Sequence, residues 1–581
     1  MNHKWAAILI AGSLSTVLDG TAGGVEQGVE FKPRYFAGEI SGVNILPEPP
    51  GSVLQLAETR IPKDVDLENM SKWCLNYLKG SISAENGYAS SYGNWPLNDP
   101  PFSVGGDRTA IGDSEVRNDL AFVLMREMSG ISYGATEQHG LRKRILTYQH
   151  ESGLFTPPSH GDTDVLWATA WMARSLIESF ATTGDRDAIA RAEKALKAVR
   201  KYAVTANDQG QFRLAPPTEL KLGNDIIHFA YRGTLDFCIV EPFIRYFEVT
   251  GDETMLEVAR KLADGRLAGF GKYDTEHMHS HMHGVVPIAH LGAVTGDKRY
   301  LDWAENELER RAGQRTDFGW VEATNKYGAS ETCALADHLH VCVYLGRSGR
   351  TRYYDFVERA VRNYLPQEQF FINDETFQTL WSKTTYKNRE NHLALLRRLE
   401  GGFLCRTDPD DRWSKGTISL EGCCPPTGMT GLYLAWKDIV RKSPEGIWIN
   451  LAFNHDSPEA RVVSFLPDRG RMTVVARLAQ DYHIRIPSFV PWNHVRAFRG
   501  RGEYVQAEVK RNGEYVEFPN AVVGEELTVT YPLVAFVQKM NAGGKYLEIN
   551  WKGNFVLDLS PKSKVWPLFE TVPYPTPSFR P

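Results

Sequence analysis

Apolar residues recur at helical spacing from Val65 to Lys442, and polar breaks divide this stretch into segments. Several breaks share one form, in which a small polar residue and a glycine precede a new amphipathic segment. They are Ser129-Gly130, Thr183-Gly184-Asp185, Thr250-Gly251-Asp252, Thr295-Gly296-Asp297 and Ser348-Gly349. Glycine supplies the left-handed residue that ends a helix, and a following polar residue can cap the next one. The pattern predicts α-hairpins in series, arranged as a closed α/α toroid or as an open solenoid.

The period of the pattern changes after Gly446. Short segments rich in β-branched residues follow one another, and Asn512-Gly513 is a strong hairpin signal. We therefore predict a multidomain α plus β protein, with a helical domain over residues 65–442 and a β-sandwich over residues 443–581. Residues 24–64 contain several glycines and prolines between short β-like runs, so we expect an extended segment that packs on the helical domain.

The first 23 residues have the pattern of a secretory signal peptide. Met1–Lys4 is a short basic start, Trp5–Leu18 is apolar, and small residues follow. The alternative is a disordered or membrane-anchoring N-terminus, but the apolar run is shorter than the roughly 20 residues that a bilayer span needs. No later segment is apolar enough to span a membrane. We therefore expect export to the periplasm or beyond the cell.

Length and charge indicate the number of domains and exclude one class of partner. A chain of 581 residues is too long for one ordinary core, so two or three domains are expected. The formal net charge is −5, and no cluster of Lys and Arg is interleaved with aromatic residues. Nucleic acid is therefore not an expected partner.

Four residues form the strongest candidate for chemistry. Cys423 and Cys424 are adjacent and precede Pro425, which favours a helix start there, while Glu331 and Cys333 follow Ser330, a plausible N-cap for a second helix. The positive ends of two helices would stabilise thiolate and carboxylate groups, and three sulfurs with one carboxylate oxygen suit tetrahedral Zn²⁺. The alternative is a disulfide, either between the adjacent cysteines or from Cys333 to one of them.

The remaining cysteines carry no such signal. The chain has seven cysteines, an odd count for an exported protein. Cys74, Cys238 and Cys342 lie within apolar helix faces, so we expect them in the core. Cys405 has no role that the sequence indicates.

Glu331-Thr332-Cys333-Ala334 followed by Cys423-Cys424-Pro425 resembles the zinc-thiolate glycoside hydrolases typified by bacterial β-L-arabinofuranosidases, glycoside hydrolase family 127. The resemblance implies an (α/α)₆ barrel. It also implies that Glu331, Cys333, Cys423 and Cys424 bind zinc and that Cys423 is the nucleophile. Glu322 is the candidate acid/base, on a loop shorter than the family's. Its alternative is an ordinary surface glutamate.

Substrate contacts are expected from two further segments. In the histidine-rich run 276–283, a matched count places His277 where the family has a substrate-binding histidine, and His281 is the next candidate. A solvated loop or an adventitious metal site is the alternative. In the helix after His160, the corresponding positions hold Asp164 and Trp171, which suit hydroxyl recognition and stacking. Trp171 could equally belong to a core stripe with Trp167.

Three functions are compatible with the sequence. The first is an exported, zinc-dependent, retaining exo-glycosidase acting on oligosaccharides from plant or algal polysaccharides, with β-L-arabinofuranose as the family's default sugar. The second is a polysaccharide lyase or related uronate-processing enzyme on the same fold, using the histidine run. The third is a glycan-binding protein in which zinc is structural. The sequence leaves the sugar, the linkage and the oligomeric state open.

Overall fold

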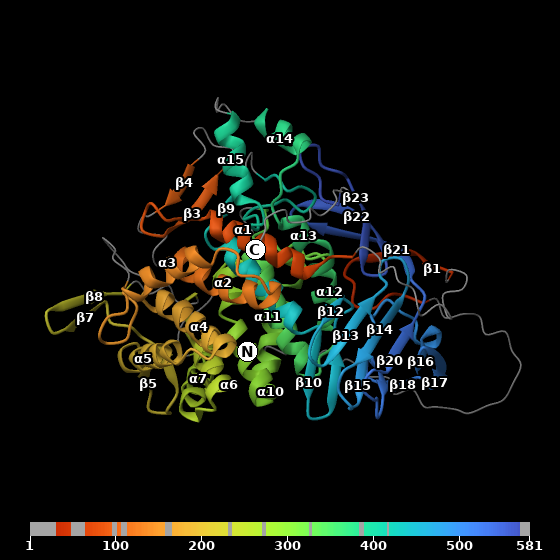
Figure 1. The fold of residues 1–581 in the computed structure, drawn as a ribbon, viewed down its shortest axis with the longest axis horizontal. Helices are drawn as coiled ribbons and strands as arrows, with labels where there is room; N and C mark the ends of the chain where they lie inside the picture. Colours follow the sequence, from red (N-terminus) through yellow and green to blue (C-terminus); the bar gives the residue numbers. More distant parts are fainter. Residues whose placement is uncertain are drawn as a thin grey trace, which may run out of the picture.

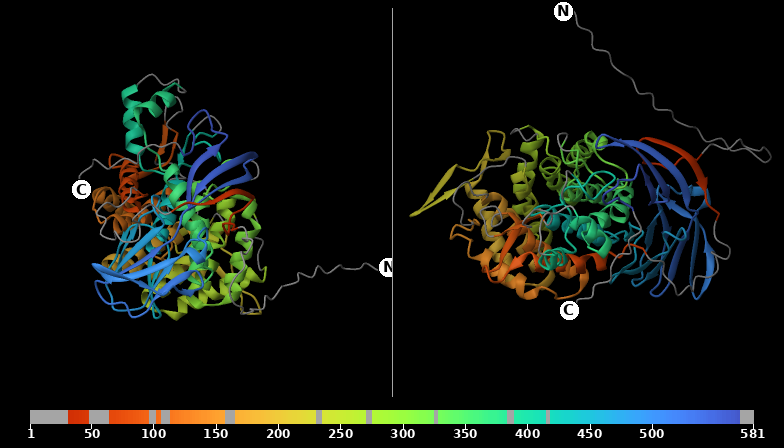
Figure 2. Two further views of the ribbon diagram at one scale, coloured as in Figure 1. Left: turned by 90° about the vertical axis from the view of Figure 1, so that its right-hand side faces the viewer. Right: turned by 90° about the horizontal axis from the view of Figure 1, so that it is seen from above.

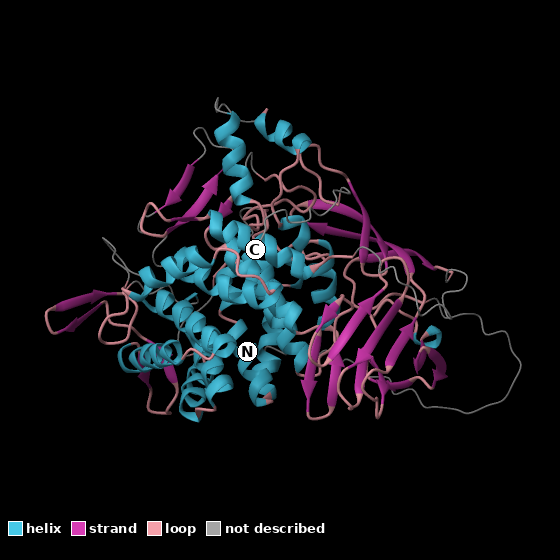
Figure 3. Ribbon diagram, in the orientation of Figure 1, coloured by secondary structure: helices cyan, strands magenta, loops and turns pink. Residues whose placement is uncertain are grey.

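The computed structural model describes residues 31–47, 64–95, 102–105, 113–156, 165–229, 235–269, 275–324, 328–382, 389–414 and 418–569. The signal peptide predicted for residues 1–23 lies outside these ranges. A body of helices occupies one side of the molecule and most strands lie beside it (Figures 1 and 3). Among the described helices, none combines the length and apolar character that crossing a bilayer requires.

The helical domain is built from paired helices. Its principal helices are α1 (Leu67–Gly80), α2 (Glu115–Ser129), α3 (Ala135–Leu146), α4 (Val165–Thr183), α5 (Arg186–Tyr202), α6 (Val240–Thr250), α7 (Glu253–Leu267), α9 (Val286–Thr295), α10 (Lys298–Arg310), α11 (Thr332–Arg347), α12 (Tyr353–Asn363) and α16 (Cys424–Lys437). Gly251 and Gly296 end their helices in the left-handed conformation, and Asp252 and Asp297 accept hydrogen bonds as N-caps of the next. The predicted hairpin turns are confirmed at these positions.

The helices lie in two layers. Helices α2, α4, α6, α9 and α11 pack one against the next in chain order, and α16 packs against both α11 and α2. Helices α1, α5, α7, α10 and α12 pack against α2, α4, α6, α9 and α11 respectively. Helix α11 is buried along nearly its whole length, whereas α5 and α10 bury one face only. This difference is what an inner and an outer layer require.

Shorter elements complete the helical domain. The helices are α8 (Met278–His283), α13 (Leu365–Glu368), α14 (Asp374–Trp381) and α15 (Arg389–Leu399), and the strands are β2 (Ile82–Ser83), β3 (Ala89–Trp95), β4 (Phe102–Gly105), β5 (Val204–Ala206), β6 (Phe212–Leu214), β7 (Glu219–Leu222), β8 (Asp225–His228) and β9 (Leu420–Glu421). Helical periodicity did not predict these strands. Strand β3 pairs with β9, which ends two residues before Cys423.

The C-terminal part consists of mainly antiparallel sheets (Figure 2). One sheet has the order β12-β13-β14-β20-β16-β17 and a second has the order β10-β11-β15-β19-β18. Their strands are β10 (Val440–Ser443), β11 (Gly446–Ile449), β12 (His455–Asp456), β13 (Ala460–Ser464), β14 (Arg471–Ala476), β15 (Tyr482–Arg485), β16 (Arg496–Arg501), β17 (Glu503–Ala507), β18 (Lys510–Asn512), β19 (Tyr515–Phe518) and β20 (Glu526–Thr530). The coarse prediction of a helical domain followed by β-sheets is confirmed.

A third C-terminal sheet includes the N-terminal segment. Strand β1 (Glu39–Ile45) pairs with β21 (Val534–Ala542), followed by β22 (Lys545–Lys552) and β23 (Phe555–Ser560). The residues before β1 also contact the helical domain, since Ala37 N donates to Asp317 Oδ2 at 2.7 Å. The segment therefore joins both parts of the molecule.

Candidate active site

Two helix N-termini meet where the sequence placed the metal site. Helix α11 begins at Thr332 with Glu331 as its N-cap, one residue later than the predicted cap Ser330, and α16 begins at Cys424 with Cys423 as its N-cap. The two helices pack against each other. Their positive ends therefore face the same cluster of side chains, which favours anionic sulfur and oxygen there.

The spacing of the side chains fits a metal ion. Cys424 Sγ lies 3.4 Å from Cys333 Sγ and 3.9 Å from Cys423 Sγ, and Glu331 Oε2 lies 3.6 Å from Cys333 Sγ. With bonds of about 2.3 Å to sulfur and 2.0 Å to oxygen, a tetrahedral zinc ion separates two sulfurs by ~3.8 Å and sulfur from oxygen by ~3.5 Å. The three thiols could therefore hold a metal, with the carboxylate at the edge of the site.

Cys423 differs electrostatically from its neighbours. Hydrogen bonds from the adjacent cysteine thiols lower the pKa of the Cys423 thiol well below its usual value, and the charge of Arg117 adds to this effect. Burial raises the pKa of Cys333 and of Cys424. Cys423 is also the only one of the three that is partly exposed. A partly exposed thiol with a lowered pKa is the one suited to act as a nucleophile.

A fourth cysteine joins this cluster. Cys405 is buried, and its thiol contacts those of Cys423 and Cys424. Backbone hydrogen bonds place it there, since Cys405 N donates to Ser419 O and Ser330 N donates to Thr407 O, both at 2.8 Å. These partners lie far apart in the sequence, so no local spacing could have assigned Cys405 to the site.

Glu322 lies next to the segment that carries the ligands. It forms an antiparallel bridge with Ser330, and Glu322 N donates to Gln314 O at 2.8 Å. Burial raises the pKa of its carboxyl. A carboxyl with a raised pKa keeps its proton to higher pH, as a general acid must.

Within the histidine run, residues 278–283 form helix α8. His277 is the N-cap of α8, and its Nε2 lies 2.8 Å from Glu331 Oε2. His281 instead lies 2.9 Å from Glu307 Oε2. The structure thus brings His277, but not His281, to the carboxylate of the thiol cluster.

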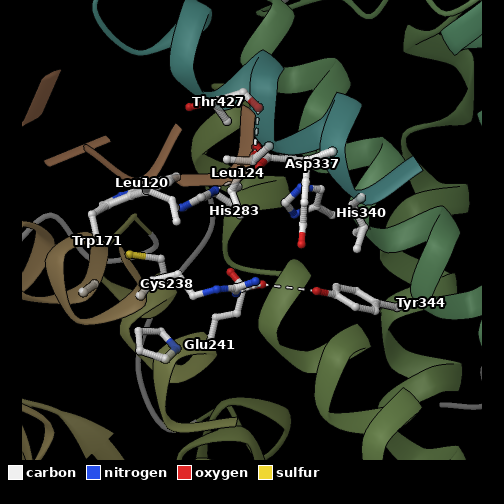
Figure 4. Close-up of a pocket in the computed structure, with 16 residues that line it drawn as sticks. Leu120, Leu124, Trp171, Cys238, Glu241, His283, Asp337, His340, Tyr344 and Thr427 are labelled. Atoms are coloured by element: carbon white, nitrogen blue, oxygen red, sulfur yellow. Dashed lines mark hydrogen bonds and ion pairs between the residues drawn. The ribbon is translucent and has the colours of Figure 1, made fainter. Parts of the chain in front are cut away.

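Of the other two predicted substrate contacts, Asp164 lies outside the described residues. Trp171 is buried on α4, where its ring is nearly parallel to that of His283, with centroids 5.6 Å apart. Trp171 and His283 line a cavity of about 50 Å³ inside the helical domain, together with Glu241, Asp337 and Tyr344 (Figure 4).

A further group of polar side chains, not predicted from the sequence, lies beside the thiols. His279 and His283 are one turn apart on α8, and both contact Asp337 on α11. The signal was present in the sequence, because residues four apart share a helix face.

No protein-family profile and no curated protein sequence matches this chain. Solved structures do resemble it. A family 127 β-L-arabinofuranosidase from Geobacillus stearothermophilus T6 superposes with a TM-score of 0.57 at 13% identity, with 86% of each chain covered. A second family 127 β-arabinofuranosidase gives a TM-score of 0.56 at 13% identity, covering 85% of this chain and 84% of the other. At this identity the likeness shows a shared fold.

Proposed function

We propose that this chain is a zinc-dependent, retaining exo-glycosidase that acts on oligosaccharides like a β-L-arabinofuranosidase. The observation that carries the proposal is the partly exposed Cys423 thiol, whose pKa is lowered, at the N-terminus of α16 beside Cys333, Cys424 and Glu331. The fold shared with two arabinofuranosidases supports the choice of substrate class.

In this reaction Cys423 Sγ attacks the anomeric carbon while the bond to the leaving oxygen breaks. Glu322 donates its proton to that oxygen, and the sugar stays bound to the sulfur. Glu322, now a carboxylate, then takes a proton from water, whose oxygen attacks the same carbon and releases Cys423. Two displacements retain the configuration at the anomeric carbon.

Cys333, Cys423, Cys424 and Glu331 would hold the zinc ion. When bound, zinc keeps coordinating thiols deprotonated near neutral pH. His277 Nε2–H donates a hydrogen bond to Glu331 Oε2 and so fixes the orientation of that carboxylate. The same oxygen lies 3.6 Å from Cys333 Sγ, so this hydrogen bond fixes it at the edge of the thiol cluster.

We also infer that the helical domain is an (α/α)₆ toroid. The packing of α16 against both α11 and α2 supports closure of the inner layer. Export remains a proposal that rests on the pattern of residues 1–23. Sequencing the N-terminus of the mature protein would test it.

The function is tested by incubating the full chain, supplied with zinc, with aryl β-L-arabinofuranosides and with aryl glycosides of other sugars. We expect hydrolysis with retention and a covalent glycosyl adduct on Cys423 in mass spectra of quenched enzyme. An adduct on Glu322 or Glu331 would refute the thiol mechanism. An unsaturated product that absorbs in the near ultraviolet would identify a lyase instead.

A further inference from the structure

A second buried polar cluster lies beside the thiols and consists of His279, His283 and Asp337. His279 Nδ1 is 2.6 Å from Asp337 Oδ2, and His283 Nδ1 is 2.8 Å from Asp337 Oδ1. The three residues are 3%, 5% and 1% exposed. One carboxylate from α11 thus orients two imidazoles from α8. We call this set the His-Asp-His cluster.

The residue types of this cluster would suit a metal ion, but the distances between its atoms are not those of a metal site. Two ligand atoms bound at 2.0–2.1 Å to a tetrahedral zinc ion lie about 3.3 Å apart. Distances of 2.6 and 2.8 Å are those of short hydrogen bonds. The thiol sulfurs, in contrast, lie 3.4 and 3.9 Å apart, near the ~3.8 Å that a tetrahedral zinc ion would require. The His-Asp-His cluster is therefore a hydrogen-bonded unit.

Hydrogen bonding at Nδ1 leaves the other nitrogen of each ring for a ligand. Within the described part of the chain, neither His279 Nε2 nor His283 Nε2 has a hydrogen-bond partner, and both atoms are buried. A buried polar atom without a partner costs about 1–3 kcal/mol. Two such atoms on rings held by one carboxylate indicate a site that a polar ligand completes.

The cluster extends from the thiols to the cavity. The His279 ring lies beside that of His277, with centroids 6.0 Å apart, and His277 Nε2 is 2.8 Å from Glu331 Oε2. His283 lines the cavity of about 50 Å³ and stacks on Trp171 (Figure 4). Such a cavity has room for a few water molecules, and hence for the hydroxyl groups of a sugar. The His-Asp-His cluster therefore joins the neighbourhood of Glu331 to the cavity.

We propose that His279 and His283 each bind one hydroxyl group of the sugar that reacts at Cys423, and that Asp337 is the positioning residue for both rings. The proposal rests on the proposed function. Hydroxyl groups fit because each can donate to a neutral imidazole or accept from a protonated one. Burial alone would lower the pKa of His279, but the Asp337 carboxylate outweighs it and raises that pKa.

The experiment compares the parent aryl glycoside with analogues that each lack one hydroxyl group. The variants are His279→Asn and His283→Asn, because the asparagine amide can replace Nδ1 as a donor to Asp337 while Nε2 is lost. His290→Asn is the matched control, since His290 is also buried but pairs with Glu248 at 3.2 Å. Zinc content and melting temperature are measured for each protein.

For wild type, we expect removal of a paired hydroxyl to lower kcat/KM roughly 10–100-fold. On the parent glycoside, each histidine variant should have a kcat/KM lower than that of wild type by about the same factor. Within each variant, removal of one particular hydroxyl should lower kcat/KM almost no further, and this hydroxyl should differ between the two variants. Asp337→Asn should weaken discrimination at both hydroxyls. His290→Asn should retain the wild-type pattern.

If a histidine variant loses the same factor in kcat/KM, relative to wild type, on the parent and on every analogue, the proposal is overturned. A second metal ion in wild type that is absent from His279→Asn and His283→Asn would also overturn it. If wild type hydrolyses no glycoside, the proposed function fails separately. The same variants are then titrated with L-arabinose and its deoxy analogues, followed by tryptophan fluorescence. Binding that does not depend on any hydroxyl group would refute the subsite.

Discussion

Glu368 on α13 supports the turn that carries Glu331 and Cys333. It is fully buried, and its Oε2 lies 2.9 Å from the hydroxyl oxygen of Thr332, the residue between those two. Thr332 also donates to Leu404 O. A hydroxyl carries only one proton for these two oxygens, so a protonated Glu368 carboxyl relieves the competition between Glu368 Oε2 and Leu404 O. Burial raises the pKa of Glu368 to about 7, which favours the protonated form.

This proton predicts a pH-dependent stability. The pKa of Glu368 is higher in the folded chain than its ordinary value of 4.5, so its contribution is complete below about pH 4.5 and is lost as the pH rises through about 7. At 1.36 kcal/mol per pKa unit, the loss is on the order of 3 kcal/mol. Glu368→Gln keeps the shape and donates an amide N–H to Thr332 at every pH. The variant should therefore lack this pH-dependent part of the stability.

The assay is the thermal unfolding midpoint of wild type and Glu368→Gln in matched buffers from pH 5 to pH 8. We expect the midpoint of the variant to rise relative to wild type by roughly 2 °C across this range, since the unfolding entropy of a chain of this length is on the order of 1.2 kcal/mol/K. Glu503→Gln, at an exposed position on β17, is the control and should show a constant difference. A constant difference for Glu368→Gln as well would mean that Glu368 does not carry the proton.

Three further predictions concern the thiol site. The purified chain should contain about one zinc ion, and its removal by a chelator should lower the melting temperature; no metal together with a disulfide in the intact mass would contradict this. Glu322→Gln should slow turnover of poor leaving groups roughly 10²–10⁴-fold and spare activated aryl glycosides, and equal losses on both would assign the acid role elsewhere. Cys423→Ser and Cys424→Ser should both weaken zinc binding, but with excess zinc only Cys423→Ser should fail to form the covalent adduct; an adduct in that variant would exclude Cys423 as the nucleophile.

Features fixed by local chemistry could be predicted from the sequence. The turns at Gly251-Asp252 and Gly296-Asp297 end one helix and cap the next through interactions within a few residues. Helix starts at Glu331 and at Pro425 follow from a polar cap and from prolines. The structure places the first one residue later, at Thr332, and the second one residue earlier, at Cys424. The meeting of the two starts was a hypothesis from their residue types that the resemblance strengthened, because their packing is a long-range property.

Long-range packing also explains what the sequence did not yield. The six residues of α8 are too few for periodicity to distinguish a helix from a strand, and the hydrogen bonds of His279 and His283 to Asp337 cross from α8 to α11. The position of Cys405 depends on backbone hydrogen bonds to two other segments, from Cys405 N to Ser419 O and from Ser330 N to Thr407 O. Both features are outcomes of the fold rather than of local pattern.

The distance between the two thiol-bearing helices has an identifiable cause. On α16, a Cβ added at Gly428 would lie 2.9 Å from Thr332 Cγ2, and one at Gly431 would lie 3.0 Å from the Cβ of Ala336. Any larger residue at these positions would force α16 away from α11. Because Cys333 and Cys424 project from the first turns of these helices, the same separation sets the 3.4 Å between their sulfurs. In the sequence the two glycines read only as weak helix formers, yet in the fold they allow the thiols to approach to metal-binding distance.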